Sequence, residues 1–498
     1  MKIAFRADAS IEIGTGHVMR CLTLAEALRD QGAECQFICG SQDGNMLQTI
    51  RDRGFRASSV EAFMNWKSDA EQTQAVLAGS VVNWVVVDHY GLDAYWEQAL
   101  KAHCRKLMVI DDLADRPHDC DLLLDQNLGR TKNDYERLVP QACQLLIGPE
   151  YALLRPEFSA WRDYSLKRRA TNPQFKHLLI SMGGTDYPNS TSQILEALKK
   201  SLWPIDCRIT VVMGMSSPWI RQVTDLAKTM PWTTDVRVNV SNMAELMANS
   251  DLAIGAAGST SWERCCLGLP SLIVILAENQ KSGAAHLVQS GVAILLEPAA
   301  DIAKTLSEAI TATSNLQMLQ HMSKAASQMA CGQGKARITD QFYNSKIREM
   351  EYSDLEVVLA WRNHPKIRAC MHSQHEISFS EHENWYAHAR QNPEKHLLIF
   401  ECNGEALGFV NFTETTTHGD ADWGFYVSPF APKGSGKRLG HAALQYAFTT
   451  LKLKRIRGEV LRNNLVSQRF HKMLGFGLEA PTKKNDISFS LTKQEYAQ

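Results

Sequence analysis

The chain has 12 cysteines among its 498 residues, but no two of them stand in a CxxC pair. Structural zinc sites rely on such spacings, so we expect scattered thiols that serve as small buried hydrophobes in a reducing cytosol. HxH and HExxH motifs are missing as well. The sequence therefore predicts no metal cofactor. The doublet Asp111-Asp112 is the one place where paired acids with the capacity to hold magnesium occur.

Excess charge and long apolar runs are also lacking. The formal net charge is -1, so nothing in the composition favours nucleic acid or an anionic membrane as a partner. No apolar stretch is long enough to cross a bilayer. The first eight residues form a short apolar run broken by Arg6 and Asp8, which is typical of a buried strand rather than a signal peptide. We expect a cytoplasmic protein.

The length of the chain predicts about three packed units. Short β-rich runs alternate with helical segments up to residue 343, a pattern that predicts parallel sheets covered on both faces. Pro156, Pro173 and several charges mark a bridge between two Rossmann-like lobes, residues 1–155 and 156–343. Two such α/β lobes imply a cleft with ligands at the carboxyl ends of their strands.

The pattern changes after residue 343. Strands of antiparallel character follow, and Asn403-Gly404 between two alternating runs is a strong hairpin signal. A glycine-rich loop and a helix come next. Residues 344–498 are therefore predicted to form a third domain of the α+β class.

The sharpest motif of the first lobe is Gly14-Thr15-Gly16-His17 at a strand-to-helix turn. Glycines let the backbone approach a ligand, and a helix N-terminus favours negative charge. Met19 stands where a dinucleotide fingerprint has its third glycine, which argues against a nicotinamide cofactor. The helix dipole disfavours an imidazolium at His17, so we expect a neutral ring that accepts a proton. A helix-start histidine bonded to backbone fits the spacing equally well.

Residues 255–263 in the second lobe read Gly-Ala-Ala-Gly-Ser-Thr-Ser-Trp-Glu, after a strand and at the start of a helix. Small residues leave room for phosphates against free amides. These are Gly258, Ser259 and Thr260. Glu263 is placed to accept two ribose hydroxyl groups, although Thr260-x-x-Glu263 is also a capping box, which spacing alone slightly favours. Gly183-Gly184 after another strand is a further candidate phosphate or sugar contact.

Several motifs together resemble the pseudaminic-acid-pathway UDP-sugar hydrolase over about residues 1–343. They are Phe5-Arg-Ala-Asp-Ala-Ser10, Ile13-Gly-Thr-Gly-His-Val-Met-Arg20, Val87-Asp-His-Tyr90, Ile110-Asp-Asp-Leu-Ala114, Gly148-Pro-Glu-Tyr-Ala-Leu-Leu-Arg155 and Gly183-Gly-Thr-Asp186. The resemblance implies two lobes in a GT-B-like arrangement, with UDP mainly on the second. It also implies hydrolysis of UDP-2,4-diacetamido-2,4,6-trideoxy-β-L-altrose to free sugar and UDP.

In this reading His17 is the general base toward the attacking water, and Asp8 is a second catalytic candidate. The expected substrate contacts are Arg6, Gly14, Gly16, Arg20, Asp88, Tyr90, Gly183, Gly184, Gly258, Ser259, Thr260 and Glu263. Asp8 and Asp88 fit equally well as carboxylates that only cap loops.

The C-terminal domain carries Lys433-Gly-Ser-Gly-Lys-Arg-Leu-Gly440 between a strand and a helix. Backbone amides at a helix N-terminus can cradle a pyrophosphate. Together with Asn464-Leu-Val-Ser467 and the helix after it, this loop resembles the GNAT acetyltransferase superfamily over about residues 346–479. The resemblance implies acetyl-CoA as co-substrate. Its expected contacts are Lys433, Gly434, Gly436, Lys437, Arg438, Gly440, Asn464 and Ser467.

Two positions depart from the usual GNAT pattern. Arg438 stands where a glycine is usual, and His471 stands where many members carry the tyrosine that protonates the departing thiolate. His471 is therefore a catalytic candidate, with a half-buried helix residue as nearly equal alternative. Trp361-Arg362-Asn363 resembles members that acetylate amino sugars and members that acetylate protein N-termini.

The pairing of the two halves suggests consecutive steps, because 4-N-acetylation of the UDP-amino sugar precedes UDP removal in that pathway. The expected partners are a UDP-sugar and acetyl-CoA, with association with neighbouring pathway enzymes left open. The alternatives are a UDP-sugar glycosyltransferase, a hydrolase for a related nonulosonic-acid precursor, a GNAT domain acting on a protein N-terminus or another amine, and a non-enzymatic sensor.

Overall fold

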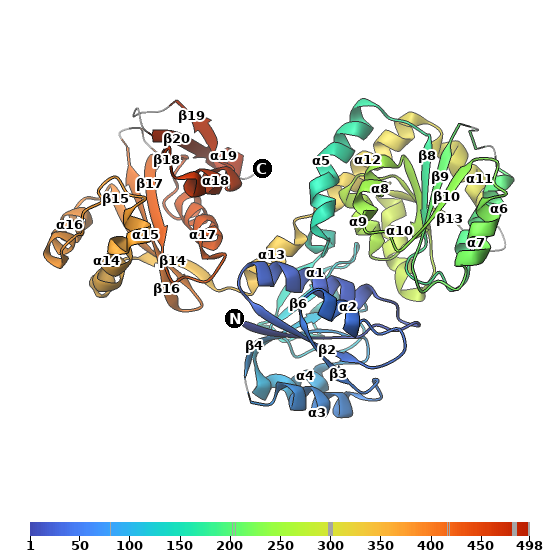
Figure 1. The fold of residues 1–498 in the computed structure, drawn as a ribbon, viewed down its shortest axis with the longest axis horizontal. Coiled ribbons are helices and arrows are strands. Elements are labelled where there is room, and N and C mark those ends of the chain that lie inside the picture. Colours follow the sequence, from blue (N-terminus) through green and yellow to red (C-terminus); the bar gives the residue numbers. More distant parts are fainter. Residues whose placement is uncertain are drawn as a thin grey trace. The chain divides into compact units, whose positions relative to one another are not determined.

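The computed structural model describes residues 1–79, 81–201, 203–204, 206–296, 302–415, 417, 419–480 and 486–496. The chain forms two compact units, one of residues 1–29 with 33–339 and the other of residues 30–32 with 340–498 (Figure 1). The first unit holds two parallel sheets and the second holds a mixed sheet. None of the helices in the described ranges is both long and apolar enough to cross a membrane.

The first lobe contains a seven-stranded parallel sheet in the order β3-β2-β1-β4-β5-β6-β7. Its strands are β1 Lys2–Ala7, β2 Glu34–Gly40, β3 Arg56–Val60, β4 Val82–Asp88, β5 Cys104–Ile110, β6 Leu122–Asp125 and β7 Gln144–Ile147. Its helical elements are α1 Gly16–Asp30, α2 Leu47–Asp52, α3 Trp66–Leu77, α4 Ala94–Leu100, η1 Lys101–His103, η2 Lys132–Tyr135 and η3 Pro149–Tyr151.

The strand order of this sheet reverses between β1 and β4. Ala7 pairs with Asp88, so both strands end at the same edge of the sheet. Ligands of open α/β sheets bind at such a switch point, because the loops that follow the two strands turn in opposite directions and leave a crevice. The first lobe therefore offers a binding site directly after Ala7 and Asp88.

The second lobe repeats the design with six parallel strands in the order β10-β9-β8-β11-β12-β13. These are β8 His177–Ser181, β9 Arg208–Met213, β10 Thr233–Val238, β11 Leu252–Ala256, β12 Ser271–Val274 and β13 Ala293–Leu296. Its helical elements are α5 Pro156–Thr171, α6 Ser190–Lys199, α7 Ile220–Ala227, α8 Met243–Asn249, α9 Thr260–Cys266, η4 Glu278–Gln280, α10 Lys281–Gln289, α11 Ile302–Thr313, α12 Leu316–Met329 and α13 Gly334–Gln341. Here the switch point lies between β8 and β11, where Ser181 pairs with Gly255.

The second unit is built on a mixed sheet in the order β14-β15-β16-β17-β18-β20-β19. Its strands are β14 Ser345–Glu349, β15 Lys395–Cys402, β16 Glu405–Glu414, β17 Asp420–Val427, β18 Arg455–Leu461, β19 Gly477–Glu479 and β20 Asp486–Thr492. Its helical elements are η5 Tyr352–Asp354, α14 Leu355–Asn363, α15 Pro365–Arg368, α16 Phe379–Gln391, α17 Ser435–Thr449, α18 Leu465–Met473 and α19 Lys493–Tyr496.

The only parallel pair of this sheet within the described ranges is β17 with β18, and its pairing stops early. It joins residues 420–422 to residues 455–457 and then ends. Among the residues that the structure describes, the remainder of β17, up to Val427, pairs with no strand on that side, while β18 stays paired with β20 up to Leu461. The sheet is therefore open between the carboxyl halves of β17 and β18.

The predicted fold class is confirmed: two parallel α/β sheets are followed by a mixed-sheet α+β domain. The hairpin signal is confirmed as well, since Asn403 and Gly404 both have positive φ between β15 and β16. The bridge after residue 155 is mostly the 16-residue helix α5, whose Pro156 occupies a first-turn position that needs no amide donor. The edge strands β3 and β10 were not expected from the sequence.

Candidate active sites

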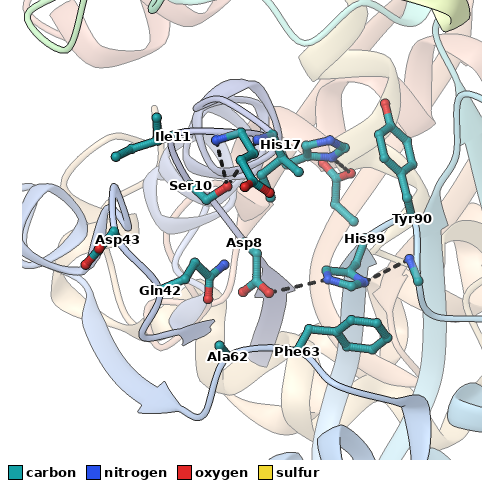
Figure 2. A pocket seen from close by; sticks show the side chains of 14 residues that line it. Asp8, Ser10, Ile11, His17, Gln42, Asp43, Ala62, Phe63, His89 and Tyr90 are labelled. Carbon is teal, nitrogen blue, oxygen red and sulfur yellow. Dashed lines mark hydrogen bonds and ion pairs between the residues drawn. The ribbon is translucent and has the colours of Figure 1, made fainter.

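A cavity of about 630 Å³ lies at the switch point of the first lobe (Figure 2). Loops that follow β1, β2, β3 and β4 form its walls. The lining residues are Asp8, Ser10, Ile11, Glu12, Ile13, His17, Gln42, Asp43, Ala62, Phe63, Asp88, His89, Tyr90 and Gly91. The cavity brings together three of the residues predicted for this lobe. His17 comes from α1, Asp88 is the last residue of β4, and Tyr90 lies in the loop after it.

His17 lies at the second residue of α1 and is held by a carboxylate. Its Nδ1 is 2.5 Å from Oδ1 of the buried Asp88, the last residue of β4. Arg20, one turn further along α1, donates to the same carboxylate from Nε at 2.5 Å and Nη2 at 2.7 Å. Burial alone would raise the pKa of Asp88, but Arg20 and His17 outweigh burial and hold this pKa well below its usual range.

An ionised Asp88 can only accept, so the proton between the two side chains belongs to Nδ1 of His17. The polar contacts of His17 within the described ranges all involve Nδ1, which leaves Nε2 for a ligand in the cavity. This is the arrangement of a general base whose tautomer is fixed by a carboxylate. The sequence predicted the base from the helix dipole, whereas in the structure the ring is oriented by its contact with the Asp88 carboxylate.

Arg20 connects this pair to a residue that the sequence did not single out as a ligand contact. Its Nη1 lies 2.9 Å from Asp112, which also accepts from the Tyr90 hydroxyl at 3.2 Å. The Tyr90 ring meets the ring of His17 edge-on, with 4.6 Å between centroids. Asp112 therefore supports the side chains that position His17, while its neighbour Asp111 pairs with Arg116.

The second lobe also reaches Tyr90. Nδ2 of Asn279 in η4 donates to the Tyr90 hydroxyl at 3.3 Å. Asn279 was missed in the sequence, where it belongs to an unremarkable run of polar residues between a strand and a helix.

Arg6 differs from its predicted role, and Asp8 fits the alternative of a carboxylate that only caps loops. Arg6 is fully buried and its guanidinium is divided between Asp8 and Asp69, so it does not reach the cavity. The carboxylate of Asp8 lines the cavity but is almost wholly buried, and it accepts from Arg6 and from the Gly40 amide at 2.7 Å. Because these donors come from β1 and β2, the contacts make Asp8 a carboxylate that fixes strand ends, with Arg6 as its counter-charge.

His89 also lines the cavity, between Asp88 and Tyr90, but it was not predicted as a site residue. Its Nε2 lies 3.4 Å from Asp8, and its Nδ1 accepts from the Gly91 amide at 3.1 Å (Figure 2). Both ring nitrogens are thus occupied, in contrast to His17. His89 therefore shapes the wall without offering a free base.

The two predicted glycines of the first loop have different reasons to be there. Gly14 has φ of +76°, in the left-handed region that favours glycine, and its amide donates to the Ser10 carbonyl at 2.9 Å. Gly16 opens α1, and a Cβ there would meet no atom within 4 Å. Gly14 is required by the turn, while Gly16 leaves open space beside His17.

In the second lobe, Glu263 lies in the first turn of α9, as expected, but not in a capping box. Helix α9 begins at Thr260 with no side-chain cap. Instead, Glu263 pairs with Arg155 at 3.5 Å. Burial raises the pKa of Glu263 to about 7, and Arg155 and Arg264 oppose that shift only in part. The Glu263 carboxylate therefore does not cap its own helix and points instead toward Arg155.

The other glycines predicted as ligand contacts in this lobe follow β8 and β11, at the carboxyl edge of the sheet. Gly183 has φ of +94°, which favours glycine, and a Cβ there would meet nothing within 4 Å. Gly184 and Gly258 would place a Cβ no closer than 3.9 Å and 3.5 Å to a neighbour. Ser259 and Thr260 complete the turn into α9. The contacts of all five with phosphate or sugar stay predictions.

Glu263→Gln should weaken UDP binding by about 1.5–3 kcal/mol if the carboxylate accepts ribose hydroxyl groups. The pKa of about 7 adds a pH dependence. Below pH 7 the carboxyl is protonated and accepts less well, so wild-type UDP affinity should fall as the pH drops from 8 to 6. Titration calorimetry at both pH values measures it. An equally steep pH dependence in the Gln variant would contradict the assignment.

In the second unit, the predicted pyrophosphate loop lies between β17 and α17. Gly434 is the N-cap of α17 with φ of +86°. A Cβ at Gly436, in the first turn, would come no closer than 4.0 Å to Phe470. Lys433 and Lys437 are exposed. Gly436 at the helix N-terminus and the two lysines are therefore accessible to an anion.

Arg438 and Gly440 serve packing instead of the cofactor. The Arg438 guanidinium is buried over the Tyr343 ring, 4.0 Å from its centroid, and donates to Ser435. A Cβ at Gly440 would come within 2.8 Å of Phe470 and Leu474, so this glycine allows α17 to approach α18. The departure from the GNAT pattern at Arg438 is thus accommodated inside the domain.

His471 is a core residue, which corrects its predicted role as catalytic acid. It is 2% exposed, and burial lowers its pKa. Its Nδ1 donates to the Ser467 carbonyl at 2.8 Å and its Nε2 accepts from Trp423 Nε1 at 3.2 Å. With both nitrogens occupied, the neutral ring has no proton to give to a thiolate.

The side chains of Asn464, Arg362 and Asn363 form hydrogen bonds with main-chain groups. Asn464 is the N-cap of α18 and accepts from the Ser467 amide at 3.0 Å. Arg362 donates to the Ser373 carbonyl at 2.6 Å, and Asn363 exchanges two hydrogen bonds with Ile377. Arg362 and Asn363 therefore fasten the segment that connects α15 to α16.

Two family models match the chain. The Glycosyltransferase family 28 C-terminal domain matches residues 180–341, and the Acetyltransferase (GNAT) domain matches residues 346–477. Among solved structures, MurG of Acinetobacter baumannii aligns with 69% of this chain and 99% of its own, at a TM-score of 0.52 and 16% identity. That likeness shows a shared fold for the first unit, which is thus of the GT-B type.

Three relatives match the chain, one over nearly its whole length and two over one part each. An uncharacterized protein of Methanocaldococcus jannaschii is 26% identical over 98% of this chain and 99% of its own. Acetyltransferase PseH of Campylobacter jejuni is 28% identical over 26% of this chain and 80% of its own. A hydrolase of the same species is 30% identical over 58% of this chain and 97% of its own. Through its first unit, the chain belongs to the family of that UDP-2,4-diacetamido-2,4,6-trideoxy-β-L-altropyranose hydrolase, and a GNAT acetyltransferase domain follows it.

Proposed function

We propose that the chain catalyses two consecutive steps on one nucleotide sugar. The GNAT domain would acetylate the 4-amino group of a UDP-4-amino-4,6-dideoxy-N-acetyl-altrosamine with acetyl-CoA. The first unit would then hydrolyse the resulting UDP-2,4-diacetamido-2,4,6-trideoxy-β-L-altrose to free sugar and UDP. The relatives of the two halves carry these two types of activity in their names. The observation that carries the hydrolysis is the His17–Asp88 pair in the cavity of the first lobe.

The geometry suggests how the hydrolysis proceeds. Nε2 of His17 takes a proton from water as the water oxygen bonds to the substrate at the sugar–UDP linkage. That linkage breaks, and UDP leaves with the electron pair. Asp88 holds Nδ1 and stabilises the imidazolium, while Arg20 and Asp112 keep Asp88 in place. The loop before α9 and Glu263 would bind the departing UDP through amides and ribose hydroxyl groups. A positioned base of this kind contributes typically about 10²–10⁴-fold to the rate.

The acetylation needs a cradle for acetyl-CoA and a neutral amine. The N-terminus of α17 offers amides, with Lys433 and Lys437 beside it, for the pyrophosphate. The gap between β17 and β18 leaves the backbone of β17 free to bind an extended arm. The amine nitrogen attacks the thioester carbonyl, the C–S bond breaks, and free coenzyme A leaves with a proton.

Mass spectrometry of products tests both steps. With the UDP-4-amino sugar and acetyl-CoA, we expect UDP and the free diacetamido sugar in equal amounts. A glycosyltransferase, which the family 28 match makes the main rival, would release UDP only with an acceptor present. UDP release should also persist in EDTA, because no metal is expected in the reaction. Loss of activity that added magnesium restores would overturn the mechanism.

A further inference from the structure

The two faces of the mixed sheet are covered by different helices. A Cβ at Gly408 would meet Leu439 of α17 at 2.5 Å, so that face belongs to α17. The next residue, Phe409, packs in one cluster with Trp361 of α14 and Tyr386 of α16. Successive residues of a strand point to opposite faces. The helices α14 and α16 therefore cover the face opposite to α17.

Glu459 on β18 points to the α14 side of the sheet. A Cβ at its neighbour Gly458 would meet His471 of α18 at 2.5 Å, so Gly458 faces α18 and Glu459 faces the other way. Asp486 pairs with Leu461, two residues beyond Glu459, and cross-strand partners share a face. Glu459 and Asp486 thus lie together at the end of β18, beside the gap between β17 and β18.

A histidine from the segment between α15 and α16, on the same side of the sheet, completes the cluster. Ligand atoms of His372, Glu459 and Asp486 all lie within 4.8 Å of one another. His372 belongs to the segment that Arg362 and Asn363 fasten, and its Nε2 is 3.8 Å from Asp486 Oδ2. Asp486 is 2% exposed, yet this oxygen has no hydrogen-bond partner in the described structure.

A buried carboxylate oxygen without a donor is unfavourable unless a ligand supplies one. Two carboxylates and an imidazole can bind a small cation. This is either an ammonium group, which donates N–H bonds, or a metal ion, which the side chains coordinate. The site opens at the edge where the β17–β18 gap and the loop before α17 also lie, because both strands end there. The acceptor of an acetyl transfer arrives at that place as a protonated amine, a cation that brings its own N–H donors and must lose a proton before it can attack.

We propose that His372, Glu459 and Asp486 form the acceptor site of the GNAT domain and receive the ammonium group of the amino sugar. Asp486 Oδ2 and Glu459 accept its N–H groups, and one proton passes through the exposed His372 to water. The neutral nitrogen then attacks the acetyl thioester, the C–S bond breaks, and the nitrogen loses its second proton as coenzyme A leaves as thiol. The assignment rests on the proposed acetyltransferase function of this domain.

Asp486→Asn and Glu459→Gln should each raise the KM for the amine about 10- to 100-fold, because each removes a charged hydrogen-bond partner. The KM for acetyl-CoA should stay within about twofold. Glu405→Gln is the matched control, since Glu405 is an exposed acid at the β15–β16 hairpin of the same sheet. Unchanged amine KM in both site variants would overturn the proposal.

A binding measurement separates charge recognition from a merely structural effect. Calorimetry in the presence of coenzyme A, which cannot react, compares the UDP-4-amino sugar with its 4-hydroxy analogue. The wild type should prefer the amine, and Asp486→Asn should lose that preference while keeping its melting temperature and acetyl-CoA affinity. A preference that remains in the variant, or one that depends on metal and vanishes in EDTA, would contradict an ammonium site.

The same measurements show whether the acceptor site or the proposed substrate is wrong. If the wild type ignores the amino sugar but acetylates a simpler primary amine, the proposed substrate is wrong, and the same variants decide the acceptor site with that amine. If it acetylates no amine in a panel of amino sugars, polyamines and peptide N-termini, both the substrate and the acceptor site are refuted.

Discussion

His17→Asn is expected to lower UDP release from the diacetamido substrate by about 10²–10⁴-fold, the usual contribution of a positioned base. The asparagine keeps a polar group near Asp88 but has no nitrogen that can take a proton from water. The initial rate of UDP formation measures the loss. His89→Asn is the matched control in the same cavity, because both nitrogens of His89 are already occupied and the loss should be much smaller.

A crossed variant shows that this loss is local. His17→Asn should still acetylate the amino sugar, whereas Gly436→Val should stop acetylation and still hydrolyse substrate that is supplied already diacetylated. Gly436 has room for a Cβ inside the domain, so valine would obstruct the anion at the helix N-terminus without disturbing the fold. Full hydrolysis by His17→Asn would refute the mechanism. A folded variant that loses both activities would show that the two units are coupled.

Asp88→Asn should have the second largest effect, a fall in UDP release of about 10²–10⁴-fold. The amide no longer stabilises the imidazolium, and it presents an NH₂ group that competes for the histidine nitrogen. Steady-state kinetics should show the loss in kcat, because Asp88 acts through His17. His89→Asn again serves as the control, since His89 lines the same cavity but has both ring nitrogens engaged by other groups.

The same variant should be less stable at neutral pH. The folded-state pKa of Asp88 is held below its usual range by Arg20 and His17 against the effect of burial. A depressed carboxyl pKa contributes stability above the ordinary value of about 4, and this contribution disappears as the pH falls further toward the folded-state pKa. Wild type and variant should therefore differ in melting temperature at pH 7 and converge only in acid. A constant difference down to pH 3 would contradict the ion pair.

Continuous patterns in the sequence were sufficient for much of the fold. Apolar runs revealed the buried strands, and the glycine turns revealed which loops lie at strand ends. The edge strands β3 and β10 escaped because Arg-Ala-Ser-Ser-Val and Thr-Thr-Asp-Val-Arg-Val have no uninterrupted apolar run. An edge strand is covered less than a central one and therefore carries a weaker signal.

Side chains were predicted less well where burial decides their role. Arg6 follows the strand pattern of a site residue, but only the position of Asp69 shows that its charge is neutralised inside the lobe. His471 aligns with a catalytic position, but Trp423 and Ser467 occupy its nitrogens. The contacts that Asp112 and Asn279 make become visible only when the fold brings Arg20 and Tyr90 to them. Such contacts are set by tertiary packing, which spacing does not encode.

The pair of His17 and Asp88 also links catalysis to the order of folding. The two residues are 71 positions apart and meet only because β4 inserts beside β1. The intervening strands β2 and β3 lie on the other side of β1, so β1 is paired along both edges in the finished sheet. A refolding chain would therefore regain UDP release only when the central strands of the first sheet are in register. Hydrolysis is in this sense a direct reporter of long-range strand pairing in the lobe, and acetylation in the other unit can recover on its own schedule.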